Sequence, residues 1–426
     1  MSNIIVCTII AANYLPQALR LRESLLSIHP GVDFRILLVE QPEVVATIAP
    51  QIGARVLGPN EVGCDDWLQM AFYYDCMELS TALKPFLIQT LLGEGHVIYL
   101  DPDIEVLGDL SEIFEAVRAN DVTLTPHLTE PLEADGKRPA LIDFIRVGQF
   151  NLGFLGVGRS DRSRRLMDWW GEVLVENCVS DLRRDLFTDQ VWASLLVSFA
   201  DRCAVLRSRR HNVAYWNVMQ RDLRRDPEGV WMTADGPVSF FHYSGLDPGN
   251  IEAVSRHQDR IRCEKGSDLY QILQGYAQRL ARSPAASFRN HPYSFGYFRD
   301  GSPVFTSHRR TFLAISPPNR SAMVDPFSSR REIERFVDCT PYLLPSGLAA
   351  EDPAARIAEV EKMVQELRAR LRLPRYVLMD RLAAGLKRVP GLSRVVRFLV
   401  FGAWRTARRI RGMLRGKSAE RAPMRP

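Results

Sequence analysis

The stretch His96-Val97-Ile98-Tyr99-Leu100-Asp101-Pro102-Asp103 indicates the fold class most directly. Its first five residues are largely apolar and have the length of a strand, and two carboxylates flank a proline directly after them. Ligands of open α/β sheets bind outside the carboxyl ends of the strands. Asp101 and Asp103 are therefore predicted to lie at a ligand-binding edge, where both can hold one hard cation. The alternative for an isolated Asp-x-Asp triplet is a solvated turn that ends a strand.

The segments on either side of this stretch alternate between strand-like and helical patterns. Residues 4–10 and 34–40 read as strands around a helix at 15–29, and a long helical pattern covers residues 67–92. Such alternation is typical of βα units in a mostly parallel sheet. We therefore expect an α/β fold.

Length and composition indicate a folded chain with attachments to one sizeable domain. The 426 residues are 46% hydrophobic and 25% charged, which excludes collagen-like and wholly disordered classes. The catalytic-looking motifs all lie within residues 1–250, which we predict to be the main domain. Prolines interrupt residues 251–350, an expected appended irregular subdomain, and residues 351–426 are expected to form a helical C-terminal region.

The cysteines and the N-terminus indicate a reducing compartment. Seven cysteines, an odd number with no C-x-x-C pair, argue against a disulfide framework and a zinc ribbon. The first residues lack the basic region of a signal peptide. A cytoplasmic location is therefore predicted.

The net charge of +5 is unevenly distributed along the chain. Residues 375–426 contain fourteen basic and two acidic residues, a net charge of +12, which leaves −7 for residues 1–374. The acidic body makes nucleic acid an unsuitable main ligand, whereas a tail this basic favours an anionic surface.

Two helical patterns near the C-terminus indicate partners. Residues 392–415 place apolar side chains on one helical face and arginines opposite, the pattern of an interfacial membrane helix. The longest uncharged run, 398–404, is too short to span a bilayer, which needs about 20 residues. We expect peripheral association with the inner face of the plasma membrane; a helical hairpin docked on the acidic body is the alternative. Residues 353–373 have apolar residues at heptad spacing, which predicts a helix that packs on the body or, as the alternative, forms a homodimer.

Further motifs follow one another in a recognisable order. They are Thr8-Ile9-Ile10-Ala11-Ala12-Asn13-Tyr14, Lys84 at 17 positions before Asp101, Phe150-Asn151-Leu152-Gly153, Thr188-Asp189-Gln190, and His242-Tyr243-Ser244-Gly245. Together with Asp101 and Asp103 this series resembles GT-A glycosyltransferases, most closely the retaining family 8, the galactosyltransferase and glycogenin-like group. The sequence departs from that family after Gly245, where Leu246-Asp247-Pro248-Gly249-Asn250 replaces the usual Lys-Pro-Trp.

The resemblance implies a GT-A fold and a set of site residues. The metal ligands would be Asp101, Asp103 and His242, which suit Mn²⁺ or Mg²⁺. The donor-binding residues would be Thr8, Ala11, Asn13, Tyr14, Lys84, Asp101, Gly153 and Gly245. The catalytic residues would be Asp189, Gln190 and Asn151. The donor would be a nucleotide sugar, with a UDP-sugar favoured.

Each of these residues also has an ordinary structural interpretation. Lys84 can form a surface ion pair with Glu78, Asp189 can cap a helix, and Asn151 can lie in a turn. His242 can be a strand-end histidine bound to backbone, and Asn13 and Tyr14 can simply begin a helix and pack on it.

The expected function is transfer of a sugar, with retention, to a glycan or lipid-linked acceptor in cell-surface polysaccharide biosynthesis. The alternatives are a catalytically silent, membrane-bound scaffold that keeps nucleotide binding and a glycosyltransferase that modifies a protein. Residues 209–217 read as an acceptor subsite or a structural aromatic cluster. Residues 292–301 resemble an element of bacterial surface-polysaccharide glycosyltransferases, and the pattern assigns them no role.

Overall fold

The computed structural model describes residues 3–315 and 317–339, which belong to one compact unit, Met1–Leu344. The predicted helices at 353–373 and 392–415 lie outside the described residues. Among the residues that are described, no helix is long and apolar enough to cross a bilayer.

A seven-stranded sheet forms the centre of the fold, in the order β10-β6-β7-β4-β1-β2-β3. The strands are β1 (Ile4–Ile10), β2 (Asp33–Leu38), β3 (Arg55–Leu57), β4 (His96–Leu100), β6 (Val122–Pro126), β7 (Phe150–Val157) and β10 (Cys203–Val205). All neighbours are parallel except β7, which runs antiparallel to both β4 and β6. The predicted α/β fold with a mostly parallel sheet is confirmed.

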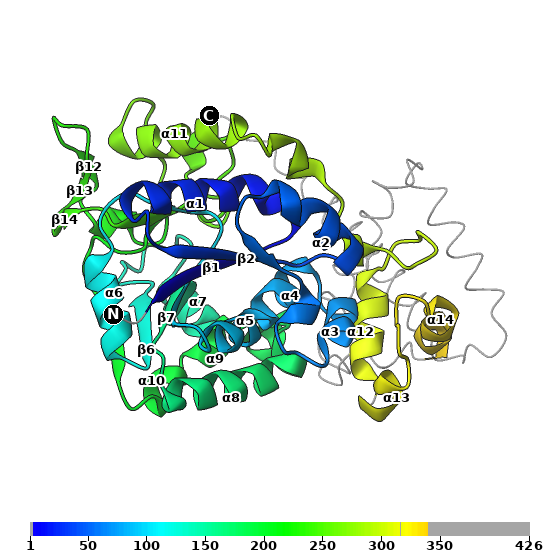
Figure 1. Cartoon of the computed structure of the whole chain (residues 1–426). Helices are drawn as coiled ribbons and strands as arrows, with labels where there is room; N and C mark the ends of the chain where they lie inside the picture. The colour runs from blue at the N-terminus through cyan, green and yellow to red at the C-terminus, as the bar shows by residue number, and fades with distance from the viewer. Residues whose placement is uncertain (1–2, 316, 340–426) are drawn as a thin grey trace, which may run out of the picture. The chain divides into compact units, whose positions relative to one another are not determined.

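Helices cover both faces of this sheet (Figure 1). They are α1 (Leu15–Ile28), α2 (Pro42–Ile48), α3 (Trp67–Tyr73), α4 (Cys76–Ala82), α5 (Lys84–Leu91), α6 (Ser111–Ala119), α7 (Leu141–Val147), α8 (Asp161–Asn177), α9 (Gln190–Ala193), α10 (Leu196–Phe199), α11 (Asp268–Ala281), α12 (Thr306–Ala314), α13 (Pro317–Ser321) and α14 (Arg330–Cys339). Alternate β1 side chains serve the two faces: Ile5 lies in the core with α5 and α8, and Val6 lies in the core with α1 and α6.

The helical pattern predicted across residues 67–92 is three helices, α3, α4 and α5. Asp75 begins α4 through a capping box, in which its carboxylate accepts from the Glu78 amide at 2.9 Å. Pro85 lies in the first turn of α5, where its missing N–H costs nothing. The apolar spacing continues across all three helices, so the sequence pattern did not show where α4 and α5 begin.

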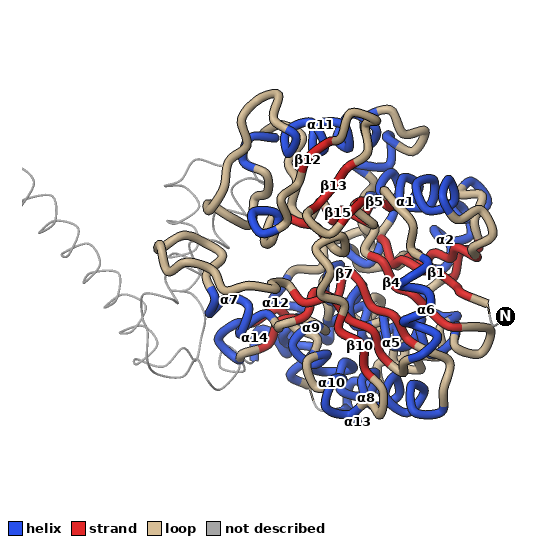
Figure 2. Tube along the Cα trace, turned by 90° about the vertical axis from the view of Figure 1, so that its left-hand side faces the viewer, coloured by secondary structure: helices blue, strands red, loops and turns tan. Residues whose placement is uncertain are grey.

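Short strands beside the main sheet bring distant segments together. β5 (Ile104–Val106), β15 (Phe240–His242) and β11 (Val213–Ala214) form one small sheet. β12 (Arg224–Arg225), β13 (Trp231–Thr233) and β14 (Gly236–Pro237) form another, and β8 (Ser180–Asp181) pairs with β9 (Leu186–Phe187). In Figure 2, β5 and β15 lie side by side, and β12 lies near α11.

The segment expected to be an appended subdomain contributes to the main cores. Phe298 and Phe312 lie 5.7 and 4.9 Å from Phe72 of α3, measured between ring centroids. The Arg309 guanidinium is buried and donates to the carbonyls of Phe72 and Tyr74 at 2.7 and 2.6 Å. The prolines between residues 292 and 326 separate short helices that pack on the body.

Phe312→Ala should lower the free energy of unfolding by about 3–5 kcal/mol, because a fully buried ring leaves a cavity against Phe72. Phe305→Ala is the matched control, since Phe305 is 39% exposed and directly precedes the same helix. Urea unfolding measures both. Equal loss in the two variants would show that α12 does not belong to the core.

Candidate active site

Asp101 and Asp103 follow β4 directly, at the edge of the sheet where β1, β2 and β4 end. The Asp101 amide donates to the Gly153 carbonyl of β7 at 2.8 Å, and the Tyr99 hydroxyl donates to Asp101 Oδ1 at 2.7 Å. The two aspartate side chains are 31% and 22% exposed. The carboxylates are thus fixed by neighbouring strands and still open to a ligand.

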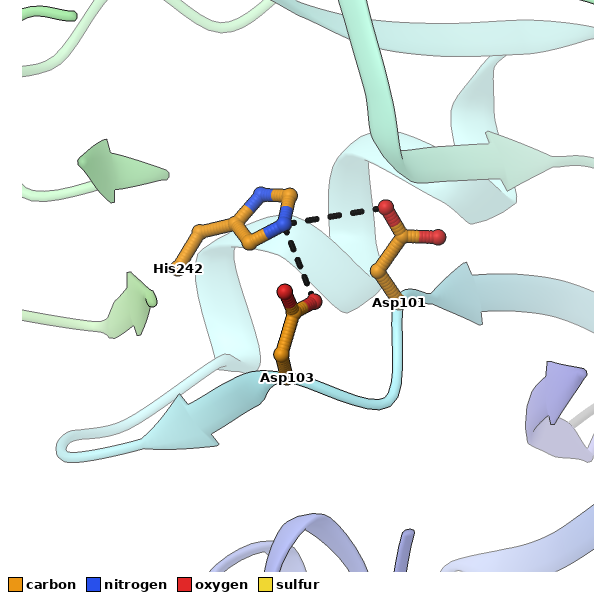
Figure 3. Close-up of side chains that lie close together, drawn as sticks. All are labelled: Asp101, Asp103 and His242. Carbon is orange, nitrogen blue, oxygen red and sulfur yellow. Dashed lines mark ion pairs between the residues drawn. The ribbon is translucent and has the colours of Figure 1, made fainter. Parts of the chain in front are cut away.

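His242 reaches the two aspartates because β15 pairs with β5. The pairing is antiparallel, with His242 opposite Ile104, and the Tyr243 amide donates to the Asp103 carbonyl at 2.9 Å. His242 Nε2 lies 3.1 Å from Asp103 Oδ1 and 3.7 Å from Asp101 Oδ2 (Figure 3). The structure therefore brings together the three side chains that were predicted to be metal ligands.

Two neighbours fix the plane of the His242 ring. A Cβ atom at Gly153 would lie 2.4 Å from His242 Cε1, so a glycine is needed for the ring to rest on β7. The Trp216 ring meets the imidazole edge to face, with centroids 5.2 Å apart. Trp216 comes from the aromatic segment 209–217, and this contact gives the segment a structural part at the site.

The charges of the cluster interact strongly. Burial raises the pKa of Asp101. Burial also pushes up the pKa of Asp103, but the charge and hydrogen bond of His242 outweigh it and the pKa is lowered. Burial pushes the pKa of His242 down, and the Asp103 carboxylate more than compensates, so that this pKa is raised. The carboxylates thus favour a positive charge at the position of His242 Nε2.

The same arrangement fits a divalent cation. One atom from each of the three residues lies within 4.8 Å of the others, and the set offers two carboxylate oxygens and one imidazole nitrogen. Mn²⁺ and Mg²⁺ accept such ligands and complete their coordination with water or phosphate oxygens. Neutralising two close carboxylates is what a bound cation would do here.

Lys84 forms a buried ion pair next to this cluster. Its Nζ lies 2.7 Å from Asp189 Oδ2, donates to the Leu152 carbonyl at 3.1 Å and stands over the Tyr99 ring at 4.2 Å. Lys84 and Asp189 are 1% and 2% exposed. Lys84 is the first residue of α5, and its charge opposes the rise in the pKa of Asp101.

The two ordinary interpretations of this pair are wrong. Glu78 does not bind Lys84, because its carboxylate accepts from Arg310 at 2.5 Å and from the Ser180 amide at 2.8 Å. Asp189 occupies the position before α9, but its side chain makes no capping hydrogen bond.

Asn151 and Gln190 line the wall formed by β7. Gln190 Oε1 accepts from the Leu152 amide at 3.1 Å, and its Nε2 donates to the Val147 carbonyl at 2.7 Å. Asn151 Oδ1 accepts from the Gly153 amide at 3.1 Å and from Asn212 Nδ2 at 3.0 Å. Each side chain is 8% exposed. Protein partners thus orient both amides, and a contact with a sugar stays a prediction for them.

The predicted donor-binding residues in and after β1 differ in accessibility. Asn13 and Tyr14 lie in the short 3-10 turn η1 (Ala12–Tyr14), and the Tyr14 side chain is 37% exposed. Burial of its hydroxyl and then the charge of Asp103 raise the pKa of Tyr14. Thr8 and Ala11 are 0% and 4% exposed, so Thr8 supports β1 from inside the fold rather than facing the opening.

Gly245 marks a turn that returns basic side chains to the site. It has a φ of +68°, and a Cβ atom there would lie 2.3 Å from His257 Cδ2. The charge of His257 lowers the pKa of Asp103, and Arg256 opposes the rise in the pKa of Tyr14. Sequence reasoning missed both residues, and the adjacent pair Arg256-His257 after the His242 motif was the available signal.

His127 was also missed. It lies behind Asn151, with Nε2 3.4 Å from Asn151 Nδ2, and burial lowers its pKa to about 4. It is therefore neutral at pH 7. A lone buried histidine carries no sequence signal that separates this position from the core.

Comparison with known proteins gives distant relatives. No protein-family model matches the chain. It is 21% identical over 267 residues to the uncharacterized protein YfnF of Bacillus subtilis (strain 168), covering 61% of this chain and 86% of that protein. It is 23% identical over 177 residues to YfnD of the same strain, covering 41% of this chain and 54% of that protein.

Among solved structures, the galactosyltransferase LgtC with donor and acceptor sugar analogues is similar at 17% identity and a TM-score of 0.37, covering 64% of this chain and 95% of that one. The glycosyltransferase GlyE of Streptococcus pneumoniae TIGR4 is similar at 16% identity and a TM-score of 0.39, covering 70% and 67%.

Mn²⁺ should bind to the wild-type protein, and Asp103→Asn should weaken binding at least about tenfold, since the variant loses a ligand and a negative charge. Electron paramagnetic resonance of free Mn²⁺ measures this binding. Asp109→Asn is the control, because Asp109 lies outside the cluster, between β5 and α6, at 63% exposure. Equal affinity in both variants would contradict the metal assignment.

Proposed function

We propose that this protein is a metal-dependent glycosyltransferase with a GT-A fold. It takes a sugar from a nucleoside diphosphate donor, with a UDP-sugar favoured, and transfers it to a glycan or lipid-linked acceptor in cell-surface polysaccharide biosynthesis. The observation that carries the proposal is the convergence of Asp101, Asp103 and His242 at the carboxyl end of β4. The order of the sequence motifs supports it.

The chain's own residues have distinct parts in this reaction. Asp101, Asp103 and His242 would hold Mn²⁺ or Mg²⁺, which supplies positive charge to the diphosphate leaving group when bound. Tyr14 offers an exposed ring to the base, and Asn13 beside it an amide. Gln190 and Asn151 would line the wall along which the sugar lies.

The Lys84–Asp189 pair bears on the stereochemistry. Asp189 is buried, and the positive charge of Lys84 pairs with its carboxylate, which makes that carboxylate a weak nucleophile. Retention of configuration would then result from attack on the same face of the sugar from which the diphosphate leaves. The acceptor oxygen bonds to the anomeric carbon as the bond to the diphosphate oxygen breaks, and the acceptor proton passes to that leaving phosphate.

Uridine diphosphate with Mn²⁺ should raise the melting temperature of the full chain by several degrees, because it binds only the folded state. Guanosine and thymidine diphosphates, each with and without Mn²⁺, are the comparison ligands. UDP release from UDP-sugars should fall at least about a hundredfold in Asp103→Asn and stay near wild type in Asp109→Asn.

Three outcomes separate the alternatives. A melting shift without UDP release from any UDP-sugar would identify the silent scaffold. Incorporation of labelled sugar into protein rather than glycan or lipid would identify a protein-modifying enzyme. Undiminished release in a folded Asp103→Asn would refute the metal-dependent mechanism.

We also propose that the basic tail holds the enzyme on the inner face of the plasma membrane, where a lipid-linked acceptor is concentrated. The full chain should float with anionic liposomes, and a chain truncated after Pro374 should not, because residues 375–426 carry the net charge of +12. Neutral phosphatidylcholine liposomes are the control. Unchanged flotation of the truncated chain would refute this proposal.

A further inference from the structure

The segment 292–301, to which the sequence assigned no role, folds beside the ends of β1 and β2. Ser294 begins the short 3-10 turn η8 (Ser294–Gly296). Its amide donates to Glu40 Oε2 at 2.8 Å, and its hydroxyl donates to the same oxygen. A residue more than 250 positions downstream therefore binds Glu40, two positions after the end of β2.

Glu40 is fully buried, and its second oxygen binds the turn after β1. Glu40 Oε1 accepts from the Ala12 amide at 2.9 Å. A buried carboxylate is costly unless donors satisfy it, so these hydrogen bonds define where the carboxylate can lie. One side chain thus links Ser294 on one side to the η1 turn on the other.

Gln41 fixes Ser294 from a second direction. The Gln41 amide donates to Ser294 Oγ at 2.7 Å, and Gln41 Nε2 donates to the Ser294 carbonyl at 2.9 Å. The Ser294 hydroxyl therefore accepts one hydrogen bond and donates another, which determines its orientation. Arg299, in the same segment, donates to Gln41 Oε1.

The η1 turn depends on this link for its shape. No side chain caps η1, and the Ala12 amide instead finds its acceptor in Glu40. The 3-10 turn η7 (Ala286–Asn290) of the same downstream region packs against η1. The residues that η1 presents are Asn13 and Tyr14, and the charge of Asp103 reaches the Tyr14 hydroxyl.

We propose that Ser294 and Glu40 are positioning residues that set the Ala12–Tyr14 turn for the nucleoside of the donor. This inference rests on the proposed function, because it takes a nucleoside diphosphate as the ligand. It assigns residues 292–301 to donor binding, although the segment touches neither the metal ligands nor the reacting atoms.

The test compares two affinities in the full chain, for UDP with saturating Mn²⁺ and for Mn²⁺ alone, by calorimetry. Ser294→Ala should weaken UDP binding about tenfold, because it removes one charge-assisted hydrogen bond from the carboxylate that holds η1. Mn²⁺ binding should stay unchanged. Ser294→Thr keeps the hydroxyl and should restore UDP affinity. Ser302→Ala is the matched control, one residue beyond the segment, since its hydroxyl binds Asp300 at the surface.

Glu40→Gln is the second variant, in case Ser294→Ala does not fold. It keeps the shape of the side chain, but its NH₂ group faces donors in place of one oxygen, so UDP affinity should fall at least as far. Wild-type UDP affinity in a folded Ser294→Ala or Glu40→Gln would overturn the inference. Parallel loss of Mn²⁺ affinity would also overturn it, by showing general disruption. Absence of UDP binding in the wild type would instead refute the proposed function.

Discussion

The site depends on one buried carboxylate, Glu105. It lies in β5, two residues after Asp103, and is fully buried. It accepts from Arg20 of α1 at 2.6 Å, from Arg279 of α11 at 2.8 Å and from the Tyr243 hydroxyl at 2.8 Å. β5 and β15 are each three residues long, and so short a pairing is weak by itself. The hydrogen bonds to Glu105 tie β5 to α1, to α11 and to the residue that follows β15. Asp103 directly precedes β5, and His242 is the last residue of β15.

The sequence predicted the parts of the site that depend on local pattern. The apolar residues of β1 and β4 indicated the parallel sheet, and Asp101 and Asp103 follow β4 as expected. It did not predict the partner of Lys84, because Asp189 is 105 positions away and hydrophobic periodicity carries no information about such pairs. Glu78, at helical spacing from Lys84, was the nearest candidate for that partner. The structure instead pairs Glu78 with Arg310, in a segment that the sequence pattern predicted to be a separate subdomain.

The downstream region was the hardest to interpret for a related physical reason. After α11 its helices are only five to ten residues long and prolines separate them, so no continuous periodicity joins them into one recognisable unit. Its contribution to the fold comes from individual side chains inserted far upstream, such as Phe312 against Phe72 and Arg309 on the carbonyls that end α3. Contacts of this kind have no fixed spacing, and only the folded chain reveals them.

Because β7 runs antiparallel to its neighbours, it connects the site edge of the central sheet with the opposite edge. β7 begins at the edge where β4 and β6 end, so Asn151 and Gly153 lie at that edge, and the Gly153 carbonyl accepts from the Asp101 amide there. The strand finishes at the opposite edge, where a Cβ atom at Gly158 would lie 2.0 Å from the Asn120 carbonyl. Both ends of β7 are therefore intolerant of added bulk, and for different reasons: at Gly153 a side chain would displace the His242 ring, and at Gly158 it would collide with backbone. A single strand thus restricts the shape of the site at one edge and the packing of the sheet at the other.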